Sequence, residues 1–212
     1  MTSDGGHPSD SVASDWPVAL RGVTESIVAT LGPNDRWNMA ALGLHAPDES
    51  GEPVEATTWG NTRTKRNFHR QGGGVVQFSP DPRAFVDAAV TIREEEHPVL
   101  PSADAWVDVA AESVATGTDG GTEWERWELR PTDTGTVAAE RPHTINRGFG
   151  AVIDATVAAS RLDVPSYDTE TLLDRLAYFE ETVEKCGGPQ ERAAFETLSE
   201  ATDWRSLTGN EG

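Results

Sequence analysis

Residues 59–82 read Trp59-Gly-Asn-Thr-Arg-Thr-Lys-Arg-Asn-Phe-His-Arg-Gln-Gly-Gly-Gly-Val-Val-Gln-Phe-Ser-Pro-Asp-Pro82, and the rest of the chain is interpreted outward from them. This stretch concentrates positive charge in a chain that has 17 lysines and arginines against 36 aspartates and glutamates, a formal net charge of −19. Arg63, Lys65 and Arg66 fall close together, and Lys65 is one of only two lysines. A negatively charged group is therefore expected to lie against this stretch.

The same residues predict a short helix. Asn61 is a good N-cap, Thr62 to Gln71 favour the helix, and Gly72-Gly73-Gly74 would end it. The first turn of a helix has unpaired N–H groups and a partial positive charge, so cations there are ordinarily unfavourable. Their presence makes sense if an anion binds the helix start. The alternative is a solvated basic face on a surface helix. The candidate anion-binding residues are Asn61, Thr62, Arg63, Thr64, Lys65 and Asn67.

Composition narrows the class of protein. A chain of 212 residues with 36% hydrophobic residues can form one substantial domain, or a domain with an appendage. Its acidity is spread along the chain and its basic residues are mostly arginine, which resembles halophilic archaeal cytosolic proteins. Like charge keeps such molecules apart while salt screens self-repulsion. The charge argues against nonspecific nucleic-acid binding.

Several kinds of site and segment are not indicated. Cys186 is the single cysteine, so a disulfide framework within the chain and a cysteine-based metal site are not expected. No apolar run is long enough to span a membrane. Residues 1–15 are polar and acidic, which predicts a flexible tail and not a signal peptide. We expect a cytoplasmic location.

Alternating and apolar segments separated by turn signals predict at least six strands before residue 131. The hairpin from Gly117 to Gly121 joins the last two. Asp81 and Pro82 predict the start of a second short helix, with Phe85, Ala88 and Ala89 facing inward. The Glu94-Glu95-Glu96 run is expected to be solvated. The predicted strands are Val23–Leu31, Asn38–His45, Val54–Trp59, Val75–Phe78, Ala105–Ala115 and Glu123–Arg130.

The composition then becomes alanine-rich and helical. We predict helices over His143–Leu162 and Thr169–Cys186, the latter ended by Gly187 as a C′ glycine, and a third that opens at Pro189. The expected fold is α+β, a mainly antiparallel barrel with inserted short helices and a C-terminal helical bundle. The expected regions are a flexible acidic tail (1–18), the barrel domain (19–141), the helical subdomain (142–205) and a frayed tail (206–212).

Several motifs resemble a known family. Thr64-Lys65-Arg66-Asn67-Phe68 followed by Val75-Val76-Gln77-Phe78 resembles the Thr-x-x-Asn-hydrophobic … Val-Val-Asn pattern of the flavin-reductase-like FMN-binding split barrels. Segments around Asp104, Asn146-Arg147-Gly148 and Gly187-Gly188-Pro189 extend the likeness to an archaeal family of unknown function within that group. The chain departs from the pattern at Thr62, where many relatives carry a basic residue, and at Gln77, which replaces asparagine.

The resemblance implies a cofactor and a place for it. In such proteins the threonine and asparagine of the motif lie at the FMN phosphate. The strand that matches Asn38, Met39, Ala40 and Ala41 holds the edge of the isoalloxazine ring with main-chain groups. From the residues alone, the small side chains of this strand indicate either a surface for a flat ring or close packing on a neighbouring strand. The resemblance also implies a homodimer, with FMN near the interface.

The sequence lacks the glycine-rich dinucleotide motif, the P-loop, paired histidines for zinc and the Gly-x-Ser-x-Gly elbow. A flavin carries its own hydride chemistry, so the missing acid–base set is compatible with an FMN-dependent oxidoreductase of unknown substrate and redox partner. A non-catalytic FMN carrier or sensor, and an assembly protein that binds an acidic partner or a phosphate metabolite, stay open. His45 and Arg147 either reach the site or are structural.

Overall fold

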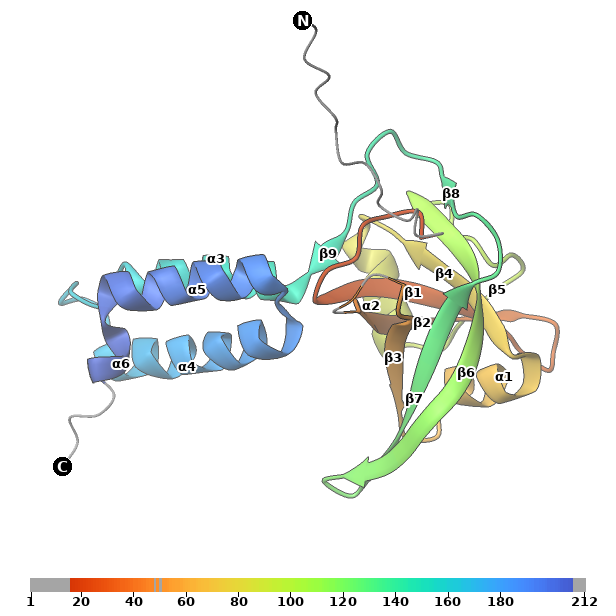
Figure 1. Cartoon of the computed structure of the whole chain (residues 1–212), viewed down its shortest axis with the longest axis horizontal. Coiled ribbons are helices and arrows are strands. Elements are labelled where there is room, and N and C mark those ends of the chain that lie inside the picture. The colour runs from red at the N-terminus through yellow and green to blue at the C-terminus, as the bar shows by residue number, and fades with distance from the viewer. Residues whose placement is uncertain (1–15, 48, 50, 208–212) are drawn as a thin grey trace, which may run out of the picture.

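The computed structural model describes residues 16–47, 49 and 51–207. A β-barrel and a bundle of helices lie side by side, with the helices formed by the C-terminal part of the chain (Figure 1). Of the two expected tails, residues 1–15 and 208–212 lie outside the described residues. Trp16 and Val18 pack against the core of the barrel.

The barrel is a closed antiparallel ring of strands in the order β2-β3-β7-β6-β4-β1, which the pairing of β1 with β2 completes. The short strands β5 and β9 extend the sheet, and β8 pairs with β6. Alternating side chains of the ring strands point into the barrel, which explains the period-two pattern of the sequence. The ring strands are β1 (Val23–Leu31), β2 (Trp37–His45), β3 (Val54–Trp59), β4 (Gly73–Phe78), β6 (Ala105–Asp119) and β7 (Thr122–Pro131); the others are β5 (Arg93–Glu95), β8 (Thr136–Val137) and β9 (Ile145–Asn146).

One stretch of the ring is open. On the side away from β1, β2 pairs with β5 over Trp37 to Met39 and with β3 only at Leu44 and His45. Between these pairings, residues 40–43 have no strand on that side among the strands that the structure describes. In an antiparallel ladder, alternate residues direct their amide and carbonyl groups to opposite neighbours. Some main-chain groups of this stretch therefore point away from β1 with no ladder partner. The barrel is split here.

Two apolar cores lie on the two faces of the sheet. The inner core fills the barrel and includes Val28, Leu44, Val76 and Trp127. The outer core lies under α2 (Pro82–Val90), where Ala84 and Ala88 pack against strand residues such as Ile27 and Met39. Burying this apolar surface supplies the main driving force for folding.

The sequence placed the two inserted helices correctly, α1 at Arg63–Gln71 and α2 at Pro82–Val90. Asp81 caps α2, as predicted, and its carboxylate accepts a hydrogen bond from the Arg83 amide. The expectation that Ala89 faces inward is wrong, because Ala89 is exposed and Ala84 takes the buried position. The predicted loop after residue 117 is also shorter, since β6 continues to Asp119 and the chain reverses at Gly120 and Gly121, both with positive φ.

The C-terminal helices pack on an alanine face. The helices are α3 (Arg147–Ala159), α4 (Thr169–Cys186), α5 (Pro189–Thr202) and α6 (Trp204–Leu207). Ala151, Ala155 and Ala158 of α3 are buried, whereas Phe149 and Ile153 are about half exposed (53% and 50%). Alanine leaves little side chain between helix axes, so α3 lies close to α4 and α5. The expected start of this helix at His143 is wrong, because β9 precedes it and Asn146 caps it.

Close backbone contacts join the helical bundle to the barrel. A Cβ on Gly22, just before β1, would lie 2.4 Å from the Cys186 carbonyl oxygen at the end of α4. Within the bundle, a Cβ on Gly148 would lie 2.5 Å from the Cα of Gly187. Asn146 Nδ2 donates to the carbonyl oxygens of Arg21 (2.7 Å) and Cys186 (3.2 Å). Gly187 ends α4, as predicted, and it does so at the C-cap in an extended conformation, with its amide donating to the Val183 carbonyl oxygen. A side chain at Gly187 has no room, because a Cβ there would lie 2.6 Å from the Val183 carbonyl oxygen and 2.9 Å from the Cβ of Glu191.

Candidate functional site

The start of α1 is capped by a different residue from the one predicted. Thr62 is the N-cap, and its hydroxyl accepts a hydrogen bond from the Lys65 amide at 3.2 Å. Asn61 lies one residue earlier, where its side-chain and main-chain oxygens both accept from Arg66 Nη1 at 2.8 Å. The Arg66 cation is thereby turned back toward the loop before the helix. Asparagine is also a good N-cap residue. Because Thr62 caps the helix here, the Asn61 side chain is available to bind Arg66.

The buried face of α1 anchors the helix on the barrel. Thr64, Asn67 and Phe68 are buried, and Phe68 packs edge-to-face on Trp127 with ring centroids 5.0 Å apart. Asn67 Nδ2 donates to the Thr30 hydroxyl at 3.0 Å, and its Oδ1 accepts from Arg70 Nη2 at 2.8 Å. Asn67 therefore fixes α1 to β1 and has both ends of its amide occupied.

Arg63 is the most accessible cation of the first turn among those predicted to bind an anion. Its side chain is 40% exposed, and its Nη1 lies 2.6 Å from Oε1 of Glu94. Glu94 belongs to β5 and stands opposite Asn38 in the ladder between β5 and β2. Glu94 is only partly solvated, with its side chain 31% exposed, and its carboxylate also accepts from Asn34 Nδ2 at 3.2 Å. Through Glu94, the start of α1 is connected to the strand predicted to meet the ring.

Lys65 forms an ion pair with the buried carboxylate of Glu125. Its Nζ lies 3.3 Å from Oε2 of Glu125, which is only 3% exposed, and His69 Nε2 lies 3.0 Å from the same oxygen. Ser113 Oγ donates to the other carboxylate oxygen at 2.5 Å. Burial alone would raise the pKa of Glu125, but the hydrogen bonds from Ser113, His69 and Lys65 outweigh it and hold the pKa below its usual value. The Glu125 carboxylate is therefore charged at neutral pH.

Gln77 has a structural role. It is fully buried in β4, its Nε2 donates to the Pro98 carbonyl oxygen at 2.9 Å, and its Oε1 accepts from the Leu100 amide at 2.8 Å. Its amide thus secures the loop at 98–100. The departure from asparagine at this position leaves the first turn of α1 untouched.

The four predicted ring-binding residues divide between the two faces of β2. Asn38 is buried, stands opposite Thr30 of β1, and so lies near the Asn67 anchor. Met39 is buried on the outer face, with its sulfur 3.7 Å from Gln77 Nε2. Ala40 and Ala41 are partly exposed and begin the open stretch of the strand. The structure thus brings Asn38 close to α1, while Ala40 and Ala41 offer main-chain groups beside it.

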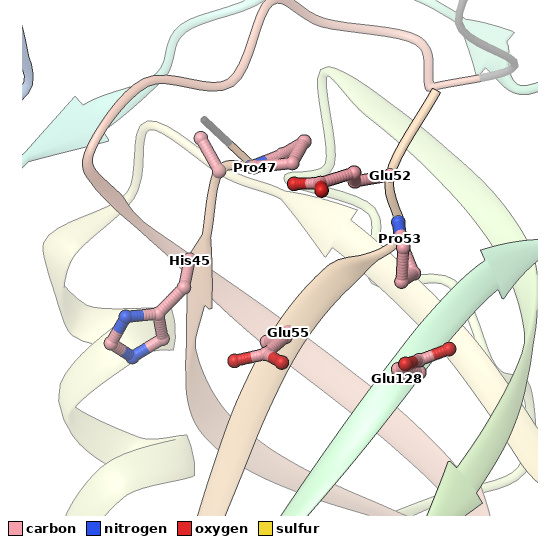
Figure 2. A pocket seen from close by; sticks show the side chains of 7 residues that line it. His45, Pro47, Glu52, Pro53, Glu55 and Glu128 are labelled. Atoms are coloured by element: carbon pink, nitrogen blue, oxygen red, sulfur yellow. The ribbon is translucent and has the colours of Figure 1, made fainter. Parts of the chain in front are cut away.

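His45 lies at the other end of β2, roughly 23 Å along the strand from Asn38 at about 3.3 Å per residue. It lines a pocket of about 350 Å³ with Glu52, Glu55 and Glu128. Figure 2 shows His45 beside Glu55, with Glu128 reaching in from β7. Burial lowers the pKa of His45, which Glu55 opposes and Arg126 reinforces. His45 is therefore not part of the cluster at α1.

Two acidic residues at the site escaped the sequence analysis. Glu94 was hidden in a run of three glutamates, and its pairing with Arg63 depends on contacts distant in sequence. Glu125 carried a usable signal, because it shares the strand face of Trp127 and Leu129, both buried. A glutamate on the apolar face of a strand requires partners, and Lys65 and His69 are those partners.

The arrangement suits anion binding more than acid–base or metal chemistry. Arg63 and Thr64 occupy the first two positions of α1, where main-chain N–H groups have no partner within the helix. Within residues 16–47, 49 and 51–207, no group of three or more histidine, cysteine, aspartate or glutamate side chains is arranged to hold a metal ion. In that same part of the chain, every helix is too short or too polar to cross a bilayer.

Comparison with known proteins gives the family. The N-terminal domain of the proteins of unknown function DUF447 matches residues 24–138, and the C-terminal part of DUF447 matches residues 146–200. No curated protein matches. An FMN-bound DUF447 protein from Methanosarcina mazei is similar in structure, with 25% identity over 86% of this chain and 96% of that one, at a TM-score of 0.45.

Two further solved structures are less similar in sequence. A flavin reductase complexed with NADP+ has 16% identity over 58% of this chain and 85% of its own, with a TM-score of 0.38. Component B of nitrilotriacetate monooxygenase from Bacillus cereus has 15% identity over 66% and 83%, with a TM-score of 0.43. The family matches cover most of the barrel and of the helical bundle, so the chain belongs to the DUF447 family of proteins of unknown function.

Proposed function

We propose that this protein binds FMN, with the phosphate at the start of α1 and the ring along the open stretch of β2. The observation that carries the proposal is the placement of an accessible guanidinium, Arg63, at the positive end of a helix that lies beside a strand with unpaired main-chain groups. A phosphate dianion is stabilised by such a terminus, and an arginine adds a charge-assisted hydrogen bond.

The donor set fits a phosphate group. The donors that fit a phosphate are the main-chain amides of Arg63 and Thr64, the exposed Thr62 and the Arg63 guanidinium. The guanidinium is available because Glu94 covers it only in part. Lys65 contributes positive charge while it stays bound to Glu125. Asn67 does not bind the ligand in this proposal, because its amide is occupied by Thr30 and Arg70. Asn67 instead holds the helix in position.

The open stretch of β2 fits the ring edge. Alternate residues among Ala40 to Gly43 offer amide donors and carbonyl acceptors without a strand partner on that side within the described chain. Ala40, Ala41 and Gly43 carry little side chain, so a flat molecule can approach the backbone. A bound flavin supplies hydride and electron transfer, and the protein positions it and controls access.

Family membership supports the choice of FMN. The Methanosarcina mazei protein was solved with FMN bound and belongs to the same family. We further propose that this chain is an FMN-dependent oxidoreductase, located in the cytoplasm. A non-catalytic FMN carrier or sensor is the alternative, because the titratable side chains described at the site are engaged in ion pairs, Arg63 with Glu94, and Lys65 and His69 with Glu125.

The test of binding is a fluorescence titration of the protein with FMN at fixed salt. Replacing Arg63 with alanine is expected to weaken FMN about tenfold to a hundredfold, the loss of one charge-assisted hydrogen bond. Arg66→Ala is the matched control, because Arg66 is on the same helix but bonds to Asn61. No binding by the wild-type protein, or equal loss in both variants, would exclude this site.

The test of turnover is separate. The FMN-loaded protein is mixed with NADH, NADPH or a deazaflavin donor, and bleaching of the oxidised flavin absorbance is followed by stopped flow. Reduction much faster than that of free FMN by one donor supports the oxidoreductase. Binding with no accelerated reduction by any donor supports the carrier.

A further inference from the structure

A second pocket, of about 310 Å³, lies where the barrel meets the helical bundle. Glu25 of β1, Phe85 of α2, Ile145 of β9 and Arg147 at the start of α3 line it. Phe85 and Ile145 supply apolar walls, and the two charged residues supply the polar groups. A small apolar pocket with a few converging polar groups is the usual form of a ligand site.

Glu25 lacks partners that would explain its burial. Its side chain is only 13% exposed, and within the described residues no side chain or amide donates a hydrogen bond to it. Arg147 is its ion-pair partner, but Nε lies 4.0 Å from Oε1, beyond hydrogen-bond distance. Burial raises the pKa of Glu25, and the Arg147 charge offsets this only in part. A partly buried carboxylate without a hydrogen-bond donor has acceptor capacity left for a ligand.

The surroundings leave room beside this carboxylate. Glu25 stands opposite Gly43 in the ladder of β1 with β2, and Ala41 is the next residue of β2 on the same face. A Cβ on Gly43 would lie 3.9 Å from Glu25 Oε2. Gly43 also ends the open stretch of β2, so the pocket borders the strand to which the ring is assigned.

The pair of charges selects the chemistry of the ligand. A carboxylate only accepts hydrogen bonds and a guanidinium only donates them. A simple amine would bind Glu25 but be repelled by Arg147. A simple carboxylate would bind Arg147 but be repelled by Glu25. A neutral edge that carries an N–H donor next to a carbonyl oxygen satisfies both residues at once. The apolar walls suit a planar ring behind that edge.

We propose that this pocket binds the imide edge of a planar heterocycle, with the ring N–H donating to Glu25, the neighbouring carbonyl accepting from Arg147, and the ring against Phe85. Such an edge has two sources. One is the pyrimidine half of a flavin bound along β2, and this source rests on the proposed function. The other is a separate cyclic imide of the uracil type, which does not.

The experiment uses probes that lack the phosphate. Lumiflavin carries the imide edge without the ribityl phosphate, 3-methyllumiflavin blocks the N–H donor, and uracil carries the edge alone. Binding of each to the full-length protein is measured by fluorescence titration or calorimetry. We expect lumiflavin or uracil to bind, 3-methyllumiflavin to bind at least tenfold more weakly than lumiflavin, and Glu25→Leu and Arg147→Ala each to weaken binding about tenfold to a hundredfold.

Two controls identify the source and the site. Arg63→Ala should leave lumiflavin binding unchanged while it weakens FMN, since lumiflavin has no phosphate. Glu55→Leu removes a glutamate from the pocket of His45 and should change none of the affinities. Dependence on Glu25 for lumiflavin supports the flavin source, and dependence for uracil without lumiflavin binding supports a separate imide.

The imide pocket at Glu25 and the FMN site at Arg63 can be excluded separately. If FMN binds with Arg63 dependence but Glu25→Leu and Arg147→Ala alter no affinity, the imide pocket is overturned and the FMN site stands. If 3-methyllumiflavin binds as tightly as lumiflavin and uracil does not bind, the pocket is also overturned. Arg147 is 55% exposed, so its variant keeps the test valid even if the Glu25 variant does not fold.

Discussion

Arg63 and Glu94 form an ion pair with 2.6 Å between Nη1 and Oε1, and it links the first turn of α1 to the short strand β5. Because Glu94 is paired with Asn38 in the ladder, this contact connects the helix start to the beginning of the open stretch of β2. The same contact places a negative charge beside the cation assigned to a phosphate. Glu94 therefore holds the Arg63 side chain in position, and it also competes with the phosphate for the Arg63 guanidinium.

Removing the charge of Glu94 should strengthen anion binding. In Glu94→Gln the side chain can still hydrogen-bond to Arg63, but it no longer neutralises the guanidinium or repels a dianion. We expect FMN to bind about threefold to tenfold more tightly at low salt, and the gain to shrink as salt screens the charges. A fluorescence titration at several salt concentrations measures both effects.

The control for this prediction is Glu96→Gln. Glu96 belongs to the same glutamate run, but it pairs with Arg36 at 3.0 Å and its side chain is 76% exposed. Its replacement should change FMN affinity less than twofold. Weaker binding by the Glu94 variant would mean that Glu94 acts only to orient Arg63.

The second prediction concerns the N-cap of α1, whose replacement should lower the stability of the protein. Replacing Thr62 with alanine removes the acceptor of the Lys65 amide, so the free energy of unfolding should fall by about 0.5–2 kcal/mol. Asn61→Ala leaves the cap intact and removes only the side-chain contact with exposed Arg66, which should cost about 0.5 kcal/mol or less. Urea denaturation of both variants compares the two costs. A larger loss for Asn61 would restore the sequence-based assignment of the cap.

Much of the fold could be predicted from local sequence. The β1 and β3 bounds and the α4 bounds agree with the sequence because alternation, helical spacing and turn residues report local geometry. The buried face of α3 could not be predicted in this way. Ala151 and Ala155 face its neighbours while Phe149 and Ile153 are outside, because close helix packing favours the small side chain over the more hydrophobic one.

The candidate site was predicted in its location more than in its contacts. A cationic first turn in an acidic chain is visible in the sequence, and the structure places Arg63 and Lys65 there. Their carboxylate partners come from strands 31 and 60 residues further along the chain, Glu94 and Glu125, so local patterns do not reveal them. The choice between Asn61 and Thr62 as N-cap likewise depended on Arg66, which binds the asparagine.

The buried Glu125 cluster should stabilise the protein above acidic pH. The folded pKa of Glu125 is lowered, so its contribution is fully present above the unfolded value of about 4.3 and is lost as the pH falls through the folded pKa. Glu125→Gln should lower the free energy of unfolding at pH 7 by about 1–3 kcal/mol, because Lys65, His69 and Ser113 lose a charged acceptor. Denaturant melts between pH 3 and pH 7 measure this difference.

The difference between wild-type and Glu125→Gln stability should shrink below about pH 4, where the wild-type carboxylate becomes protonated. Glu123→Gln is the control, because Glu123 is an exposed glutamate on the same strand and should show little difference at any pH. A difference that stays constant from pH 7 to pH 3 would mean that shape and not charge accounts for the role of Glu125.

Glu25 should affect stability with the opposite sign. Burial raises its folded pKa above the unfolded value of about 4.3, and Arg147, the one charged group facing it in the pocket, offsets this only in part. The folded state then binds more protons in the window between the two pKa values, so stability falls as the pH rises through it. Glu25→Gln removes the charge whose desolvation Arg147 offsets only in part, and should raise the free energy of unfolding at pH 7 by about 1 kcal/mol or less, since partial solvent exposure screens the effect.

This gain should shrink as the pH falls toward the unfolded value of about 4.3 and disappear well below it, where wild-type Glu25 is protonated in both states. Denaturant melts of the two proteins from pH 3 to pH 7, compared at each pH and at constant salt, cancel the contribution of the other carboxylates. Arg147→Ala should lower stability at pH 7, because it removes the charge that partly compensates the buried carboxylate. Parallel pH curves for the wild-type and Glu25→Gln proteins would show that solvent reaches the carboxylate and that the pocket does not bury it.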